Sequence, residues 1–98
     1  MNFNERVWEI VKQIPKGKVT TYKLVAEALK SKGYRAVGNA LNKNPYAPIV
    51  PCHRIVDSTG HLHGFAYGLA AKQKILEEEG LEIKNNKIVD FEKKLYRF

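Results

Sequence analysis

The chain has 98 residues, with 17 Lys and Arg against 10 Asp and Glu, and its formal net charge is +7 at pH 7. This length supports one hydrophobic core, so we expect a single domain over residues 1–98 and exclude a multi-step enzyme with its own cofactor domain. The positive charge favours a polyanionic partner such as nucleic acid. A solvated lysine-rich surface is the alternative explanation for the lysines of the second half, namely Lys72, Lys74, Lys84, Lys87, Lys93 and Lys94.

The sequence contains no signal for export, membrane insertion or a metal site. A single cysteine cannot form an internal disulfide, and no apolar run is long enough to span a bilayer. His61, His63 and the Cys52-His53 pair do not supply the four paired ligands of a structural zinc site. We therefore expect a cytoplasmic protein with no metal and no cofactor.

The first helix is expected to begin at Asn4, which can cap it, and to end at Pro15 and Gly17. Its apolar residues recur at helical spacing at Val7, Trp8, Val11 and Ile14. After a short extended stretch, Thr20 or Thr21 can cap a second helix. Its apolar residues are Leu24, Val25, Ala28 and Leu29.

A third helix is expected from Arg35 to Lys43, with Ala36, Val37, Ala40 and Leu41 turned inward. Two short helices joined by a glycine-containing turn are typical of a helix-turn-helix. The outward face of the third helix carries Arg35, Gly38, Asn39 and Asn42. A glycine in mid-helix costs about 1 kcal/mol relative to alanine, so Gly38 permits the close approach of something bulky or is simply tolerated.

Asn44-Pro45 ends the third helix, and an apolar loop leads to the cysteine. Ile55-Val56 is expected to form a strand, Asp57 to Gly60 a turn, and the segment near Leu62 a second strand that completes a wing. The predicted fold is thus mainly α with a small β wing, a winged helix-turn-helix.

A further helix is expected from Leu69 to Glu79, with Leu69, Ile75 and Leu76 inside and Gly80 just beyond its end. Three glutamates crowd its C-terminus, the unfavourable end of the helix dipole for carboxylates. Glu79 leans toward the core face, where a buried histidine is a reasonable partner; a solvated acidic cluster is the alternative. The remaining tail is expected to dock as a strand and a short terminal helix.

The tetrapeptide Pro51-Cys52-His53-Arg54 places the only cysteine beside a histidine and an arginine. No Asp or Glu occurs from Ala28 to Val56, and nearby positive charge stabilises a thiolate, which is the nucleophile, over a thiol. The composition therefore favours a reactive cysteine, although a lone Cys is also common as a buried space-filler.

The heptapeptide Val50-Pro51-Cys52-His53-Arg54-Ile55-Val56 resembles the active-site signature of the O6-alkylguanine-DNA alkyltransferases. The similarity covers nearly the whole chain, in the order and near the spacing of that family's C-terminal domain. Its other motifs are Gly17 to Tyr22, Arg35-Ala36-Val37-Gly38, Asn42 to Pro45, Gly64-Phe65 with Gly68-Leu69, and Glu79-Gly80. Most members carry an additional N-terminal domain, which we expect to be missing here.

The resemblance implies a monomer that binds double-stranded DNA containing O6-alkylguanine through the minor groove and flips the damaged base. Arg35 then fills the vacated place in the stack, Tyr22 contacts the backbone and the flipped guanine, and Asn44 ties the turn before the active-site loop. The expected DNA contacts are Arg35, Ala36, Gly38, Asn39, Asn42, Lys43 and Arg54. The expected substrate pocket consists of Tyr22, Asn44, Pro51, Ile55, Phe65, Ala66 and Tyr67, and we expect the bulky Tyr67 to favour small adducts.

The chemistry that the resemblance implies is a single transfer. Cys52 attacks the alkyl carbon, His53 takes the thiol proton through a water, Glu79 orients the imidazole, and Tyr22 assists the departing guanine oxygen. Two alternatives stand beside it. One is an alkyltransferase-like protein that recognises the lesion without transfer, and the other is a winged-helix transcription factor with an incidental cysteine.

Overall fold

Short helices make up most of the chain in the computed structural model, which describes residues 1–31, 33–47, 49–65 and 68–98. The helix α1 (Phe3–Val11) begins two residues earlier than expected, and its cap is Asn2 rather than Asn4. The Asn2 side chain accepts from the Glu5 backbone N–H at 2.9 Å, and the Glu5 carboxylate accepts from the Asn2 N–H at 3.2 Å. This reciprocal pair is a capping box, so the acidic residue three positions after Asn2 decides where the helix begins.

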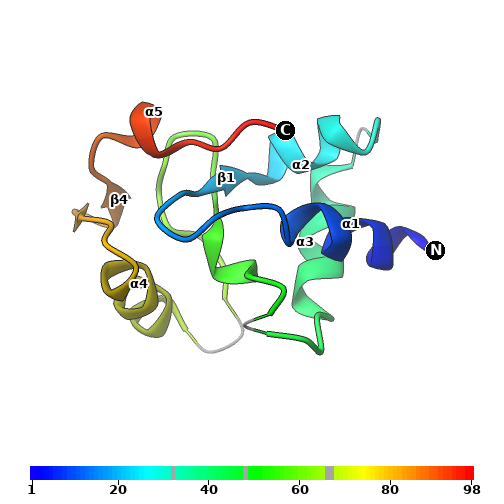
Figure 1. The fold of residues 1–98 in the computed structure, drawn as a ribbon, viewed down its shortest axis with the longest axis horizontal. Helices are drawn as coiled ribbons and strands as arrows, with labels where there is room; N and C mark the ends of the chain where they lie inside the picture. Colours follow the sequence, from blue (N-terminus) through cyan, green and yellow to red (C-terminus); the bar gives the residue numbers. More distant parts are fainter. Residues whose placement is uncertain (32, 48, 66–67) are drawn as a thin grey trace.

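The helices α2 (Tyr22–Ala28) and α3 (Tyr34–Asn42) pack with α1 around the first core cluster (Figure 1). Thr21 is the cap of α2, as predicted, and its hydroxyl accepts from the Leu24 N–H at 3.0 Å. The α3 helix buries Val37 and Ala40 completely, but Ala36 is exposed, contrary to the inward face expected for it. The buried members of this core are Val7, Val11, Ile14, Val25, Ala26, Leu29, Val37, Ala40, Leu41, Val50 and Ile55.

The predicted pairing of the wing is wrong. The strand β2 (Ile55–Val56) pairs in parallel with β1 (Thr20–Thr21), with Thr20 opposite Ile55 and Thr21 opposite Val56. Leu62 belongs to no strand, and its N–H donates to Asn86 O at 2.9 Å. Both residues of β2 are completely buried, so this strand needs partners on the inside of the molecule rather than a neighbouring hairpin arm. The coarser prediction of a mainly helical domain with few strands is confirmed.

The helix α4 (Leu69–Glu78) contributes Leu76 to a second core cluster and is rotated relative to the prediction. The buried members of this cluster are Val19, Val56, Leu62, Leu76, Leu81 and Ile88. Leu76 is buried as expected, but Leu69 is 42% exposed and Lys72 has no exposed surface at all. Lys72 stands four residues before Leu76 and therefore shares its inward face. The lysine finds hydrogen-bond acceptors there that the sequence does not reveal.

The C-terminal segment forms a hairpin, a helical turn and a strand-like end rather than one strand and one helix. The strands β3 (Ile83–Lys84) and β4 (Lys87–Ile88) are antiparallel, and α5 (Phe91–Lys94) follows them. Leu95 then forms a parallel bridge with Val19, and the Tyr96 N–H donates to Val19 O at 2.7 Å. The chain end thus covers the segment that leads into β1 (Figure 1).

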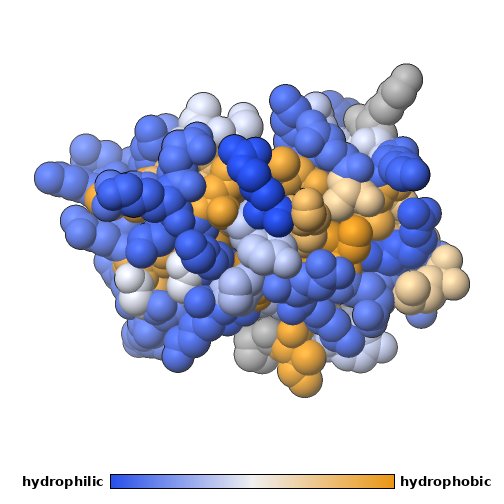
Figure 2. All heavy atoms as spheres, turned by 45° about the horizontal axis from the view of Figure 1, so that its top comes forward, coloured by the Kyte–Doolittle hydropathy of each residue, from blue (hydrophilic) through white to orange (hydrophobic). Residues whose placement is uncertain are grey.

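Hydrophilic side chains cover much of the face drawn in Figure 2, with apolar patches between them. None of the helices described has both the length and the apolar character needed to cross a membrane.

Candidate active site

Cys52 begins a single turn of 3₁₀ helix, η1 (Cys52–Arg54), between Pro51 and β2. The Arg54 N–H donates to Pro51 O at 2.9 Å, which closes this turn. With three residues per turn, consecutive side chains diverge by about 120°. As a result Cys52 lines a cavity, His53 is buried with 3% exposure, and Arg54 reaches toward the end of α4.

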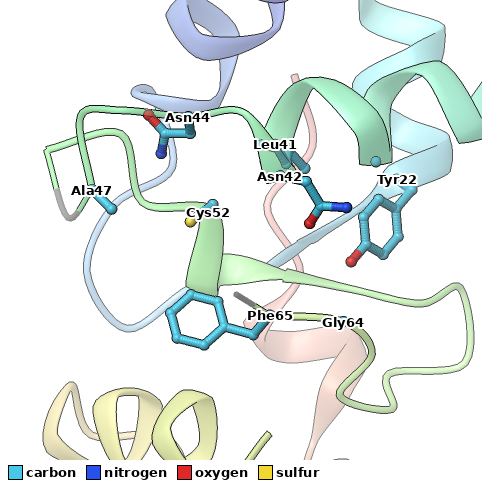
Figure 3. Close-up of a pocket in the computed structure, with 9 residues that line it drawn as sticks. Tyr22, Leu41, Asn42, Asn44, Ala47, Cys52, Gly64 and Phe65 are labelled. Atoms are coloured by element: carbon cyan, nitrogen blue, oxygen red, sulfur yellow. The ribbon is translucent and has the colours of Figure 1, made fainter. Parts of the chain in front are cut away.

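The cavity next to Cys52 is built from segments that are far apart in the sequence (Figure 3). Figure 3 shows Cys52, Phe65 and Tyr22 around it, contributed by η1, by the loop before α4 and by α2. Its lining residues are Tyr22, Gly38, Leu41, Asn42, Asn44, Ala47, Cys52, Gly64 and Phe65. The predicted pocket residues Tyr22, Asn44 and Phe65 are therefore brought together with the cysteine.

Tyr22 presents a protonated phenol at this cavity. Its hydroxyl donates to His63 O at 2.7 Å. Burial, with negative charge at Cys52 and Asp57, raises the pKa of Tyr22 to about 12. The phenol therefore keeps its proton at physiological pH and can serve as a hydrogen-bond donor.

Glu79, the C-cap of α4, joins the two residues that follow the cysteine. Its Oε2 lies 3.0 Å from His53 Nε2 and 2.6 Å from Arg54 Nη2, and its Oε1 accepts from Arg54 Nε at 3.0 Å. The bidentate geometry is the strong form of an arginine–carboxylate pair. These contacts offset the unfavourable position of a carboxylate at a helix C-terminus. The sequence-based expectation that Glu79 meets a buried histidine is thus observed.

The protonation states at this cluster follow from burial and charge. Burial lowers the pKa of His53 below its ordinary 6.5, although the hydrogen bond and charge of Glu79 act in the opposite direction. Burial acts to raise the pKa of Glu79, but hydrogen bonds from Arg54 and His53 outweigh it and hold this pKa below 4.5. An ionised carboxylate only accepts, so the neutral imidazole carries its hydrogen on Nε2 and leaves Nδ1 free to accept a proton.

Arg54 was expected to contact DNA, but the structure turns its guanidinium into the protein. Besides the two bonds to Glu79, its Nη1 donates to Ile14 O at 2.8 Å, just beyond α1. All three guanidinium nitrogens therefore have partners within the chain. Arg54 acts here as the clamp of Glu79, and sequence reasoning assigned it the wrong surroundings because both DNA contacts and buried ion pairs favour arginine.

Asn44 ties the loop that precedes the cysteine, in the place where a tied turn was predicted. Its Nδ2 donates to Val50 O at 2.9 Å, and its Oδ1 accepts from the Tyr46 N–H at 2.9 Å. Pro51 and Ile55 are buried on either side of η1 and support the turn rather than line the cavity. The expected pocket residues Ala66 and Tyr67 lie outside the described residues.

The outward face of α3 adjoins this cavity. Arg35, Ala36, Asn39, Asn42 and Lys43 are all exposed, and Gly38 and Asn42 also line the cavity. A Cβ added to Gly38 would meet no atom within 4 Å. Packing inside the protein therefore does not require a glycine at this position.

Lys72 is the residue at this site that sequence reasoning missed. Its Nζ donates to Ile55 O, His63 O and Gly64 O at 2.5, 3.1 and 3.2 Å. A solvated surface was the alternative considered for it in the sequence, although its spacing of four from Leu76 indicates the buried face. The described residues contain no cluster of His, Cys, Asp or Glu side chains suited to a metal ion.

The family model described as 6-O-methylguanine DNA methyltransferase, DNA binding domain, matches residues 2–81. The chain is similar to a methylated-DNA–protein-cysteine methyltransferase of Sulfolobus acidocaldarius, with 52% identity over 82 residues that make up 84% of this chain and 52% of the relative. The corresponding protein of Candida glabrata is 42% identical over 87 residues, 88% of this chain and 42% of the relative. The chain thus spans about half the length of the curated relatives it matches.

Two solved structures show the same fold. Mycobacterium tuberculosis OGT in complex with DNA has a TM-score of 0.77 and 39% identity, covering 81% of this chain and 50% of that chain. Schizosaccharomyces pombe Atl1, in complex with damaged DNA containing O6-carboxymethylguanine, has a TM-score of 0.83 and 27% identity, and covers 98% of this chain and 95% of that chain.

Glu79→Ala is expected to lower the free energy of unfolding by about 3 kcal/mol, because it leaves the Arg54 guanidinium without its carboxylate in a part-buried position. The matched control is Glu78→Ala, which removes an exposed carboxylate one residue earlier and should change stability by less than about 0.5 kcal/mol. Urea unfolding followed by circular dichroism measures both. Equal effects of the two substitutions would contradict the role of Glu79 as the joint of the site.

Acidification is expected to destabilise the fold in two steps. The unfolded chain regains a histidine pKa near 6.5, so it takes up a proton that buried His53 resists, and stability falls as the pH drops below about 6.5. Glu79 and Asp57 have lowered pKa values in the fold and add a second loss below about pH 4.5.

Urea midpoints measured from pH 7.5 to 4 test this pH dependence. The His53→Gln variant should lack the first step and keep the second. A first step of unchanged size in that variant would assign it to another group.

Proposed function

Because the chain belongs to the 6-O-methylguanine DNA methyltransferase family, we propose that it repairs DNA by transferring an alkyl group from the O6 atom of guanine to Cys52, once per molecule. The observation that supports this most is the arrangement of the cysteine. Cys52 lines a cavity that adjoins the exposed face of α3, and the next residue, His53, is paired with Glu79. The relatives are about twice as long as this chain, so the proposal assigns to the chain an activity of longer proteins.

In this proposal Cys52 is the nucleophile and His53 the base. The imidazole Nδ1 accepts the thiol proton through a water, because no hydrogen bond joins the cysteine sulfur directly to His53 among the described residues. Glu79 stabilises the imidazolium that forms, as the carboxylate of a catalytic triad does. The thiolate then attacks the alkyl carbon, a C–S bond forms, and the C–O bond breaks with its electron pair leaving on the guanine O6.

Tyr22 supports the leaving group by donating a hydrogen bond. Its pKa of about 12 makes it a weak acid, so it stabilises negative charge on the departing oxygen without giving up its proton. In the unbound protein the hydroxyl donates to His63 O, which holds it at the cavity. In the reaction it donates to the guanine oxygen instead. The thioether product has no route back to a thiol, so the protein acts as a stoichiometric reagent.

We further propose that α3 is the recognition helix of a helix-turn-helix that contacts duplex DNA from the minor groove. Its exposed row of small and neutral-polar side chains suits a narrow groove, and Arg35 at its start can fill the space left by a flipped base. The net charge of +7 favours binding to the negatively charged phosphate backbone of DNA. The DNA complexes formed by two structural relatives support this choice of partner.

A second candidate function is lesion recognition without transfer. It is favoured by the likeness to Atl1, whose solved structure holds damaged DNA containing O6-carboxymethylguanine and covers 98% of this chain and 95% of that chain. The presence of Cys52 beside a complete His53–Glu79 pair favours transfer instead.

Incubation with duplex DNA containing one O6-methylguanine is expected to increase the mass of the intact protein by one methylene, located on Cys52 by peptide mapping. Cys52→Ser should show no increase while keeping the fold, because it removes the nucleophile and changes one atom. Intact-protein mass spectrometry measures both, with the unmodified duplex as the control.

Tight, lesion-selective binding without a mass increase would support the recognition function in place of transfer. Equal binding to modified and unmodified duplex would contradict both.

Gly38→Ala is expected to have effects of opposite sign on stability and on transfer. The added methyl meets no protein atom, so the helix should gain about 0.5–1 kcal/mol of stability. The same methyl stands on the cavity wall and should slow transfer if the base or its phosphate approaches Gly38 closely. Urea unfolding and single-turnover rates measure the two effects, and a wild-type transfer rate in this variant would show that nothing approaches Gly38.

A further inference from the structure

Lys72 is a buried cation inside the wall of the cavity. It extends from α4, has no exposed surface, and donates to Ile55 O in β2 and to the adjacent carbonyls His63 O and Gly64 O. An ammonium has three N–H donors and no acceptor, so three carbonyls satisfy it completely. One side chain thereby joins α4, the strand that follows Cys52 and the loop that borders the cavity.

Burial of a charged lysine costs desolvation free energy, which a residue that serves only as packing would not require. No carboxylate among the described residues forms an ion pair with Lys72. Burial therefore lowers the pKa of Lys72 to about 8, against the influence of negative charge at Cys52 and Asp57. An apolar side chain at this position would fill the same space without the desolvation cost of a charge.

The His63 carbonyl connects Lys72 to Tyr22. This oxygen accepts from Lys72 Nζ at 3.1 Å and from the Tyr22 hydroxyl at 2.7 Å. Gly64, whose carbonyl Lys72 also binds, lines the cavity beside Tyr22 and Cys52. The position of the Tyr22 hydroxyl therefore depends on a carbonyl that Lys72 holds in place.

We propose that Lys72 is a positioning residue for the transfer reaction, whose ammonium holds the His63–Gly64 backbone against β2 and thereby fixes the Tyr22 hydroxyl at the cavity until it donates to the substrate. The inference rests on the proposed function for its kinetic consequence and on the described contacts for its geometry. Lys72 itself does not touch the substrate.

The charge of Lys72 also acts on ionisable groups from each element packed around it. These groups are Cys52 and His53 in η1 and Asp57 after β2. Loss of the Lys72 proton removes this charge and one of the three N–H donors at the same time. The clamp is therefore expected to loosen as the pH rises through about 8.

Lys72→Met tests the clamp, because methionine keeps most of the unbranched side chain and removes the donors and the charge. The matched control is Lys74→Met, the same substitution at an exposed position of α4. Single-turnover transfer from a duplex with one O6-methylguanine gives the maximal rate constant and the half-saturating DNA concentration. Lys72→Met should lower the rate constant about tenfold or more and leave half-saturation nearly unchanged, whereas Lys74→Met should leave the rate constant unchanged.

The pH profile distinguishes the clamp from a merely structural role. The ratio of the wild-type rate constant to that of Lys72→Met cancels groups whose titration is the same in both proteins, and it should fall as the pH rises through about 8. A ratio independent of pH would mean that the protonation of Lys72 has no effect on transfer, and would overturn the inference.

A second measurement needs neither a folded Lys72→Met variant nor activity. In wild-type protein with labelled lysine and tyrosine, the NMR signals of the Tyr22 ring, assigned with Tyr22→Phe, should shift with the titration of Lys72. Tyr22 signals that stay fixed through that titration would overturn the inference. If the wild-type protein transfers no methyl group, the proposed function fails, and this measurement still decides whether Lys72 and Tyr22 are linked.

Discussion

The carboxylate of Glu79 is the joint on which the rest of the site depends. It stands at the C-terminus of α4, where the helix dipole disfavours negative charge, and is held there by Arg54 and His53. Arg54 also binds the carbonyl of Ile14, so the Glu79–Arg54 pair ties together α4, η1 and the segment that follows α1. Since η1 begins with Cys52, the same joint sets the position of the proposed nucleophile.

Polar cross-braces, rather than apolar packing alone, shape the cavity. Asn44 bonds to both ends of the loop that precedes the cysteine, and Lys72 and Tyr22 share the His63 carbonyl on the opposite side. Such bonds specify direction as well as proximity, which packing of aliphatic side chains does not. No buried side-chain nitrogen or oxygen of the described residues lacks a partner, so these braces are satisfied. At Gly38, by contrast, the wall of the cavity leaves open space where a side chain would stand.

Local sequence patterns predicted the elements well and their partners poorly. The helices around Val7, Val25 and Val37 follow from apolar residues at helical spacing, because one face of each is buried in the shared core. Ile55-Val56 is recognisable as a strand, but its pairing with Thr20-Thr21 joins residues 35 positions apart. The residues of a buried two-residue strand do not indicate which strand pairs with it, so the sequence is equally compatible with a hairpin that includes Leu62. The start of α1 was misplaced because the capping box of Asn2 and Glu5 was overlooked, not because the signal was missing.

The sequence by itself determined the family and the chemical groups: a cysteine followed by histidine and arginine, a glycine in the middle of an exposed helix, and an acid at the wrong end of another. These are properties of residue type and spacing, which a linear pattern contains. Only the tertiary structure decided what each group faces. It turned Arg54 inward to Glu79, buried Lys72 under the cavity, and brought the Tyr22 hydroxyl to a carbonyl 41 residues away. Charged side chains are compatible with solvent, DNA or a buried partner. The hydrogen-bond acceptors that decide which of these surroundings a charged side chain has are mostly backbone carbonyls. Every residue carries a backbone carbonyl, so no sequence pattern distinguishes the ones that act as acceptors.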